Sequence, residues 1–494
     1  MRHAKRFLAA LTAVAILAGF AIPGGRVSAA APRRAPLIVL AGGGTEGELG
    51  DEAAWSARLY RHLLDRGDVN GDGRVVVAVI SAHAESDFIP GYFKSLGAHE
   101  AFNLTVDTRA AAASSATLAQ LERADAVFIK GGDQGKYYDL WNDSPLEAAL
   151  RRLADRGGAI GGTSAGAMSL AEIAFAGGKS LTSPEVLTDA CTPMLDDQDG
   201  GSGIHTDFFG FVAGATIDTH FTERARLGRM LGVMARAAGE HRKSHLLGIG
   251  LSERTGVVID DGIARVIGLE SVWFVEPAPS AVAFRKAGSP LAYGPLDAHI
   301  LVDGWSYDLV KRRPVRSASA TQGTDAASHL PESGALALSG GDLASERAFD
   351  FHVARTGPFA VIASDAPVRI HDAIGVADAH ADATRGRLQE SLVRALYDRP
   401  GTTGFLLASG TGLARTAENP RRLTFGAAPG APVAPEVACI ALSVPATSWR
   451  SLSPYVSTMD AGDGSLHAAA LTDVTIRVLA ATVQSGAAFE ILER

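Results

Sequence analysis

Short apolar runs alternate with amphipathic segments from residue 36 to about residue 307, and this alternation restricts the fold more than any other feature of the sequence. Short apolar runs are typical of buried strands, and the amphipathic segments between them are typical of helices that connect parallel strands. We therefore predict an α/β fold with a mostly parallel sheet and flanking helices. The predicted strands include residues 37–41, 75–80 and 126–129, and the predicted helices include residues 55–65, 118–123 and 145–156.

A serine stands among small residues directly after another predicted strand. The stretch GGTSAGAMSL occupies residues 161–170 and follows the apolar residues 158–161. Gly162, Ser164 and Gly166 form the pattern G-x-S-x-G, which in α/β proteins exposes a nucleophilic serine on a sharp turn between a strand and a helix. The same pattern also suits an ordinary tight turn, so other residues have to decide between the two interpretations.

A serine nucleophile needs a base within hydrogen-bond distance, and the base needs a third group that orients it. His220 follows the apolar strand pattern at 215–219, which points the imidazole toward the carboxyl edge of a sheet, where open α/β folds hold their sites. Glu253 lies at the turn of a strand–turn–strand pattern, and Gly132 offers a backbone N–H after the strand at 126–129. Each of these residues also has a plain structural interpretation, as a polar core, surface or turn residue.

The first thirty residues predict an export signal. Basic residues precede the apolar run at 7–22, and the small residues VSAA follow at 27–30. The alternative is a membrane anchor, but the apolar run is short for a span. We predict a signal peptide over residues 1–30 and a secreted or periplasmic protein without membrane contact after cleavage.

The net charge argues against a nucleic-acid partner. The formal charge is −8, and removal of residues 1–30 takes away four basic residues and no acidic ones, which leaves −12. An acidic protein does not attract phosphate backbones. We therefore expect no nucleic acid among its partners.

The composition changes near residue 315. Residues 315–345 are rich in Ser, Ala, Gly and Thr and predict a linker between a main domain at 31–314 and a smaller C-terminal α/β domain at 346–494. The C-terminal domain has predicted strands at 359–364, 405–409 and 474–478 and a predicted helix at 385–397. It contains no motif that indicates a function.

Cys191 and Cys439 are the two cysteines of the chain. In an oxidising compartment two cysteines suffice for one disulfide bond, so we predict this bridge, with two separate buried thiols as the alternative. Asp68 begins a segment that is similar to a calcium loop, but Val79 stands where such a loop needs a glutamate. We therefore predict no metal site.

Four motifs follow one another along the chain: GGDQ at 131–134, GGTSAGA at 161–167, DTHF followed by R-x-R-x-x-R at 218–229, and GIGLSE at 248–253. Together they resemble the cyanophycinases and their relatives in the dipeptidase E group of serine peptidases. The resemblance covers residues 36–310 and implies a fold like that of the class I glutamine amidotransferases, with serine in place of cysteine at the sharp turn. It also implies a polypeptide substrate and no cofactor, and we consider a homodimer as a possible assembly.

The resemblance implies a role for each residue that these motifs match. Ser164 is the nucleophile, His220 the base and Glu253 the acid that orients it. The N–H groups of Ala165 and Gly132 form the oxyanion hole. The residues that bind substrate are Gln134 and Asp218, together with the arginine cluster Arg224, Arg226 and Arg229, which suits carboxylates.

Two details limit these roles. The family often has glutamine where this chain has Thr219, which concerns substrate preference and not the three catalytic residues. Arginines at positions i, i+2 and i+5 of a helix cannot all face one way, so we expect at most two of them to contact substrate. We expect Arg229 to act mainly through stability.

The activity that the resemblance implies is hydrolysis of cyanophycin, a poly-aspartate chain with arginine on its side chains, to β-aspartyl-arginine dipeptides. One alternative is an aspartyl or isoaspartyl dipeptidase, and another is a binding protein that keeps the fold without activity. An α/β-hydrolase esterase shares the G-x-S-x-G pattern, but its acid precedes its histidine, whereas here His220 precedes Glu253.

Overall fold

The computed structural model describes residues between 35 and 490 of the chain. Up to residue 322, it describes residues 35–322 with short gaps at 69–71, 85, 178–180, 198–199 and 242–245. Beyond residue 322, it describes 353–355, 360–362, 389–390, 392–394, 396–397, 400, 403–407, 411–415, 422–427, 436–458, 467–482 and 487–490. The predicted signal peptide and most of the predicted linker lie outside these residues.

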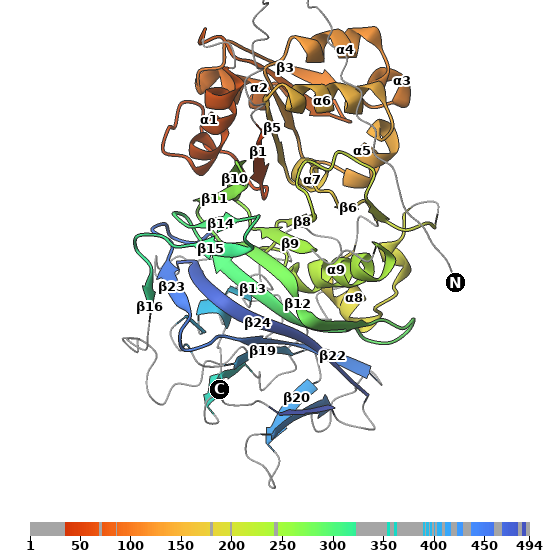
Figure 1. Ribbon diagram of the computed structural model, residues 1–494, viewed down its shortest axis with the longest axis vertical. Coiled ribbons are helices and arrows are strands. Elements are labelled where there is room, and N and C mark those ends of the chain that lie inside the picture. The colour runs from red at the N-terminus through yellow and green to blue at the C-terminus, as the bar shows by residue number, and fades with distance from the viewer. Residues whose placement is uncertain are drawn as a thin grey trace, which may run out of the picture. The chain divides into compact units, whose positions relative to one another are not determined.

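Nine strands form the first sheet, in the order β15-β14-β11-β10-β1-β5-β4-β2-β3 (Figure 1). The strands from β1 to β3 in this order are parallel, and β10, β11, β14 and β15 extend the sheet beyond β1 as antiparallel strands. The parallel strands are β1 Leu37–Ala41, β5 Ala159–Thr163, β4 Ala126–Ile129, β2 Val76–Ser81 and β3 Glu100–Thr105. The antiparallel strands are β10 Thr255–Asp260, β11 Ile263–Gly268, β14 Ser306–Asp308 and β15 Arg313–Val315.

Helices cover both faces of the parallel strands because both faces are apolar. In β1, Val39 belongs to the apolar cluster of α1 and α2, whereas Leu40 belongs to the cluster on the opposite face, which includes Leu150 of α6. Helix α6 begins with Pro145, and the Ser144 hydroxyl before it accepts a backbone N–H. The helices are α1 Trp55–Gly67, α2 Phe88–Ser95, α3 Arg109–Ala112, α4 Ser115–Glu122, α5 Gln134–Trp141 and α6 Pro145–Asp155. The predicted α/β fold with a parallel sheet and flanking helices is confirmed.

A second sheet of nine strands includes β8 and β9, the strands that precede His220 and Glu253. Its main path runs β16-β23-β24-β13-β12-β9-β8; β22 pairs with β24, and β19 pairs with β22. Only β8 and β9 of this path are parallel. The strands are β8 Ala215–Thr219, β9 Leu247–Leu251, β12 Val272–Phe284, β13 Ala292–Leu301, β16 Thr321–Gln322, β19 Thr403–Leu407, β22 Glu436–Ser443, β23 Trp449–Leu452 and β24 Ala469–Thr482.

The C-terminal strands belong to the same sheet as strands of the main domain. β24 pairs with β13 from Tyr293 opposite Val478 to Ile300 opposite Leu471, and the Trp305 indole N–H donates to the Ser451 hydroxyl at 2.8 Å. This differs from the separate C-terminal domain that the sequence predicts. The reason is that β13 has a hydrogen-bonding edge that needs a partner, and the sequence does not show which distant strand provides it.

Two short segments carry the chain between the two sheets and bring residues 252–254 and 269–271 together. Residues 252–254 connect β9 of the second sheet to β10 of the first, and residues 269–271 return the chain from β11 to β12. The two crossings are hydrogen-bonded to each other, from Ser252 N–H to Ser271 C=O at 3.3 Å and from Leu269 N–H to Arg254 C=O at 3.0 Å. Glu253 therefore lies where the two sheets meet.

The remaining elements are short except for α9, which packs on β9. In α9, Met234 approaches Gly248 so closely that a Cβ at Gly248 would lie 2.6 Å from its sulfur. The elements are α7 Ala165–Met168, α8 Ser183–Thr188, a 3₁₀ turn Pro193–Leu195, α9 Leu227–His241, β6 Ala174–Phe175, β7 Ile204–His205, β17 Val353–Arg355, β18 Ala360–Ile362, β20 Thr411–Arg415, β21 Arg422–Ala427 and β25 Ala487–Glu490. Part of the predicted helix at 385–397 is seen, with Leu392 and Leu396 buried.

Cys191 is a half-buried free thiol between α8 and the 3₁₀ turn Pro193–Leu195. The predicted bridge to Cys439 is therefore not formed. The number of cysteines indicates that a bridge is chemically possible, but it carries no information on whether their Cβ atoms come within bonding distance. Within the described part of the chain, no helix is both long and apolar enough to cross a bilayer.

Candidate active site

Ser164 lies on a strained turn between β5 and α7. Its backbone has φ 52° and ψ −123°, which is unfavourable for a residue with a side chain and is typical of the sharp turn that exposes a nucleophile. The glycines around it permit the turn. A Cβ at Gly162 would lie 2.5 Å from Gly166, and a Cβ at Gly166 would lie 2.1 Å from the carbonyl oxygen of Ile129. The predicted strand–turn–helix around Ser164 is present in the structure.

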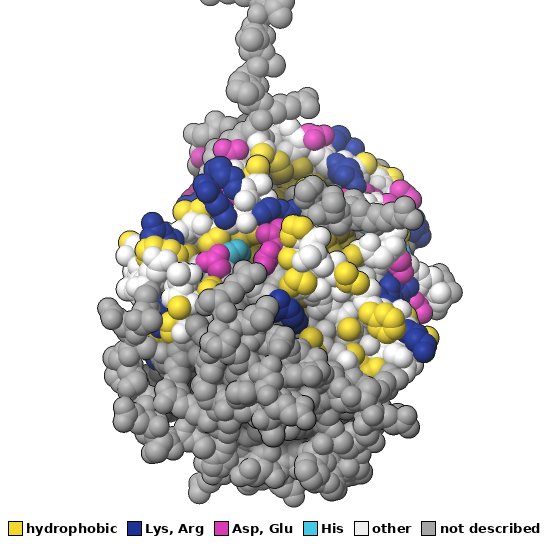
Figure 2. Space-filling view, turned by 60° about the horizontal axis from the view of Figure 1, so that its bottom comes forward, with side chains coloured by type: hydrophobic (Ala, Val, Ile, Leu, Met, Phe, Trp, Pro, Cys, Tyr) yellow, Lys and Arg dark blue, Asp and Glu magenta, His cyan; other side chains and the backbone are white. Residues whose placement is uncertain are grey.

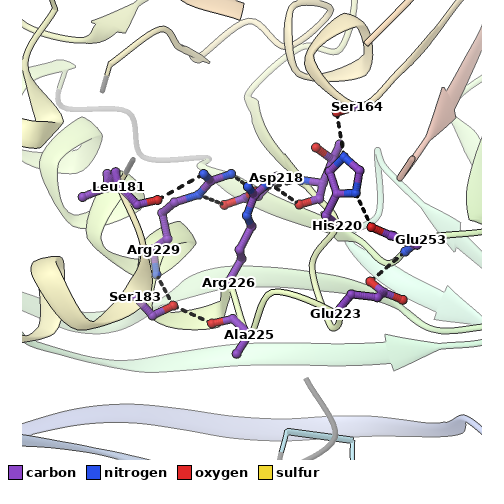
Figure 3. A network of polar contacts seen from close by, with 11 residues as sticks. Ser164, Leu181, Ser183, Asp218, His220, Glu223, Ala225, Arg226, Arg229 and Glu253 are labelled. Atoms are coloured by element: carbon purple, nitrogen blue, oxygen red, sulfur yellow. Dashed lines mark hydrogen bonds and ion pairs between the residues drawn. The ribbon is translucent and has the colours of Figure 1, made fainter. Parts of the chain in front are cut away.

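A chain of hydrogen bonds runs from Ser164 through His220 to Glu253 (Figure 3). The Ser164 Oγ lies 2.8 Å from Nε2 of His220, and Nδ1 of His220 lies 2.5 Å from Oε1 of Glu253. This arrangement orients the imidazole so that Nδ1 carries a proton and Nε2 is free to accept the serine proton. The structure brings together the three residues that the sequence selected.

The carboxyl end of β1 binds the backbone of the three segments that carry Ser164, His220 and Glu253. Three successive carbonyl oxygens, those of Ala41, Gly42 and Gly43, accept the N–H groups of Ser164, His220 and Arg254 at 3.0, 2.8 and 2.8 Å. Ser164 follows β5 of the first sheet, His220 follows β8 of the second sheet, and Arg254 follows Glu253 in the crossing between the sheets. The end of β1 is therefore the common anchor of the site.

Gly43 also fits against the face of the His220 ring. A Cβ at this position would lie 2.3 Å from Cε1 and 2.7 Å from Nε2 of His220, and Gly43 has φ +101°. Both the contact and the backbone conformation exclude a side chain. The run Gly42–Gly44 follows the strand pattern at 37–41 in the sequence, but no sequence pattern indicates that it contacts the histidine.

Burial and neighbouring charges determine the protonation of the two titratable members. Burial lowers the pKa of His220 to about 4, and the charges of Arg224 and Arg226 lower it as well, although the hydrogen bond to Glu253 acts in the opposite direction. The hydrogen bond from His220 lowers the pKa of Glu253. At neutral pH the site therefore holds a neutral imidazole and an ionised carboxylate, the forms that a general base and its orienting acid require.

Asp218 and Arg229 form a buried ion pair instead of lining the site. The Arg229 guanidinium donates to both carboxylate oxygens of Asp218, one of them at 2.8 Å, and its side chain is 3% exposed. Arg229 also donates to the carbonyl oxygen of Leu181. The structure therefore places Asp218 and Arg229, two of the predicted substrate-binding residues, in contact with each other inside the protein.

The other two arginines precede helix α9, which begins at Leu227. Arg226 donates to the carbonyl oxygen of Thr219 at 2.7 Å, and a guanidinium nitrogen lies 3.6 Å from Asp218. Arg224 is half-buried and acts on the pKa of both His220 and Glu253. Of the predicted cluster, Arg224 is thus the member with the clearest position for a substrate carboxylate.

The predicted oxyanion groups flank Ser164. Ala165 follows it at the start of α7, and Gly131, the residue before Gly132, lies so near that a Cβ there would be 3.7 Å from the Ser164 Oγ. Gly132 is exposed and has φ +149°, a conformation that suits glycine. Gln134 is half-buried at the first turn of α5, directly after this segment.

The described surface carries both signs of charge. Figure 2 shows a histidine with acidic side chains beside it, and basic and apolar side chains nearby on the same face. The described residues include no group of three histidine, cysteine, aspartate or glutamate side chains that could hold a metal ion.

The parallel sheet and the serine at its strand-to-helix turn define an α/β protein of the nucleophile-elbow class. The family model described as Peptidase family S51 matches residues 87–191. A cyanophycinase from Trichormus variabilis is 30% identical over 293 residues, which is 57% of this chain and 88% of that protein. The chain belongs to the cyanophycinase family, peptidase family S51, as the four motifs indicated.

A second relative is matched over less of its own length. A cyanophycinase from Synechococcus elongatus is 34% identical over 223 residues, 44% of this chain and 63% of that protein, so the chain spans less than two thirds of this relative. Among solved structures, a peptidase from an acI-B1 Actinobacterium covers 56% of this chain and 98% of its own, with 19% identity and a TM-score of 0.38.

Proposed function

We propose that this protein is an exported serine-type peptidase that hydrolyses cyanophycin to β-aspartyl-arginine dipeptides. Membership of the cyanophycinase family supports the substrate, and the hydrogen-bonded series Ser164, His220 and Glu253 supports the mechanism. The hydrogen bond between Ser164 and His220 at 2.8 Å is the observation that carries the proposal, because it joins a nucleophile to its base. The basic residues and apolar run within 1–30 support export.

The products define the bond that is cleaved. A β-aspartyl-arginine dipeptide keeps the amide between the aspartate side chain and arginine, so hydrolysis occurs in the poly-aspartate backbone. Ser164 Oγ attacks the backbone carbonyl carbon while its proton passes to Nε2 of His220. The C–N bond then breaks, His220 gives the proton to the leaving amine, and water, deprotonated by His220, releases the acyl group from the serine.

Two features stabilise this reaction. Ala165 follows the serine and Gly132 follows Gly131, which lies near the serine Oγ, and the N–H groups of Ala165 and Gly132 would receive the oxyanion. Ionised Glu253 stabilises the imidazolium that forms when His220 takes the serine proton. Arg224 supplies a guanidinium that suits a free carboxylate of the substrate.

The test is incubation of residues 31–494 with insoluble cyanophycin, followed by mass analysis of the soluble products. We expect β-aspartyl-arginine from the wild type and none from Ser164→Ala, which should remain folded because only one oxygen is lost. Glu253→Gln should lower turnover by about 10⁴-fold, since it favours the wrong imidazole tautomer. Turnover by Ser164→Ala at the wild-type rate would refute the mechanism.

A second candidate is an aspartyl or isoaspartyl dipeptidase. Because Arg229 engages both carboxylate oxygens of Asp218, this aspartate does not offer its charge to a substrate guanidinium. A substrate recognised through its carboxylates alone fits this arrangement. Poly-aspartate without arginine and a β-aspartyl dipeptide belong in the same assay, and equal or faster cleavage of either would favour the dipeptidase.

A further inference from the structure

A second glutamate lies directly behind the triad acid. Glu223 follows His220 by three residues, its side chain is buried, and one of its carboxyl oxygens accepts the backbone N–H of Glu253 at 2.9 Å (Figure 3). Its other oxygen, Oε1, is buried and has no hydrogen-bond partner among the described residues. Burying a carboxyl group that makes only one hydrogen bond lowers the stability of the fold. The one hydrogen bond that Glu223 makes therefore points to a role for this residue.

The hydrogen bond completes the anchoring of the crossing that carries Glu253. Three consecutive N–H groups of this crossing are satisfied: Ser252 donates to Ser271 C=O at 3.3 Å, Glu253 to the Glu223 side chain, and Arg254 to Gly43 C=O at 2.8 Å. The first and third acceptors are backbone atoms, so only the middle one can be removed by a side-chain substitution. Glu223 thus controls the peptide group of the residue whose carboxylate orients His220.

The charge of Glu223 is compatible with this position. Burial, together with the nearby carboxylates of Glu270 and Glu253, raises the pKa of Glu223 to about 8, although backbone N–H groups act in the opposite direction. Glu223 is therefore neutral at pH 7 and does not repel the ionised Glu253. A neutral carboxyl and a carboxamide are then nearly equivalent as acceptors at this place.

Residues from the C-terminal part of the chain bind a third glutamate near the triad, Glu270. Glu270 is fully buried in the returning crossing and accepts hydrogen bonds from the Ser457 hydroxyl at 2.9 Å and the Thr458 hydroxyl at 2.8 Å. The backbone N–H of Thr458 donates to it as well. The anchoring of Glu253 is therefore continuous with contacts made by residues near 457.

We infer that Glu223 is a positioning residue of the triad, whose carboxyl oxygen fixes the backbone of Glu253 and thereby the imidazole of His220. The inference rests on the proposed function of Ser164 and His220. It assigns Glu223 no contact with substrate.

The test compares Glu223→Gln with Glu223→Met, which have similar size but differ in the acceptor. The readout is the rate at which a fluorophosphonate labels Ser164, where Oγ displaces fluoride from phosphorus and His220 takes the proton. We expect Glu223→Gln to label within about threefold of the wild type, and Glu223→Met to label about 10- to 100-fold more slowly, because small displacements of catalytic groups have effects of this size. The labelling rate is expressed per folded protein, and near-UV circular dichroism measures the folded fraction of each variant.

Glu147→Met is the matched control. Glu147 is also buried and accepts a backbone N–H, that of Asp143 at 2.8 Å, but it lies on α6 away from the triad. We expect this variant to lower the melting temperature and leave the labelling rate unchanged. Equal labelling by Glu223→Met and the wild type would overturn the inference, as would equal losses in Glu223→Gln and Glu223→Met.

The same variants separate this inference from the proposed substrate. If the wild type is labelled at Ser164 but releases nothing from cyanophycin, the proposed substrate fails and the comparison of Glu223 variants remains decisive. If the wild type is not labelled, Ser164 is not activated and both proposals fail. With any substrate that the wild type hydrolyses, we expect the same difference between the two variants: Glu223→Met should have a lower kcat and an unchanged KM.

Discussion

Replacement of Gly43 by alanine tests whether the end of β1 holds His220 in its working position. The added Cβ would lie 2.3 Å from Cε1 of His220, whereas carbon atoms in ordinary contact are about 3.5–4.0 Å apart. The imidazole or the backbone must therefore move by about 1 Å or more. A displacement of this size in a catalytic group lowers the rate by about 100-fold, equivalent to about 2.7 kcal/mol in the activation barrier.

The matched control for this variant is Gly97→Ala. Gly97 has φ +111°, close to the φ +101° of Gly43, but a Cβ at Gly97 would have no atom within 4 Å. Both variants place alanine in an unfavourable conformation, which costs about 1–3 kcal/mol of stability. We expect both to melt at lower temperature, and only Gly43→Ala to lose activity. The assays are product release per folded enzyme and thermal unfolding. If Gly43→Ala and Gly97→Ala turn over at the same rate, the contact with His220 does not position the ring.

Three further predictions concern charge, pH and thiols. Arg229→Ala should lower the free energy of unfolding by about 3 kcal/mol, because it leaves Asp218 buried without its partner. The control Arg123→Ala, which breaks an exposed pair with Glu100, should change it by less than about 1 kcal/mol. Denaturant titration measures both variants, and equal effects would contradict the prediction. Since the pKa of His220 is lowered to about 4, the neutral imidazole persists down to that pH; kcat/KM should rise with pH through about 4 and stay level above it, whereas a rise near 6.5 would show an unperturbed histidine. Stability from this group is present above 6.5 and is lost as the pH falls toward 4. Thiol titration of the denatured, unreduced protein should find two free groups, since Cys191 is free and Cys439 is the only other cysteine; finding none would restore the bridge.

The parts of the fold that the sequence predicts well are those with local signals. The strand at 37–41 is β1 with the same limits, and the predicted helix at 145–156 is α6 to within one residue, because apolar periodicity and the cap at Ser144 lie within the element itself. The pairing of β13 with β24 joins residues far apart in the chain, and nothing in either strand specifies the partner. This is why the sequence suggests a separate C-terminal domain.

The candidate site divides in the same way. Ser164, His220 and Glu253 were found because each lies in a short motif that has a chemical meaning. The sequence suggests Asp218 for the substrate site because it shows a charge but not its partner. The partner is Arg229, in the first turn of α9. Glu223 was missed because a buried carboxyl that accepts a backbone N–H leaves no pattern in the sequence.

The end of β1 has a consequence for when the site can exist at all. Ala41, Gly42 and Gly43 are made early in synthesis, but the N–H groups that they accept belong to residues 164, 220 and 254. A chain still leaving the ribosome therefore carries the anchor long before it carries what the anchor holds, and these contacts between distant residues form late in folding. The residues of the proposed site therefore come together only when residues 37–254 have folded, so an incomplete or unfolded chain lacks this site.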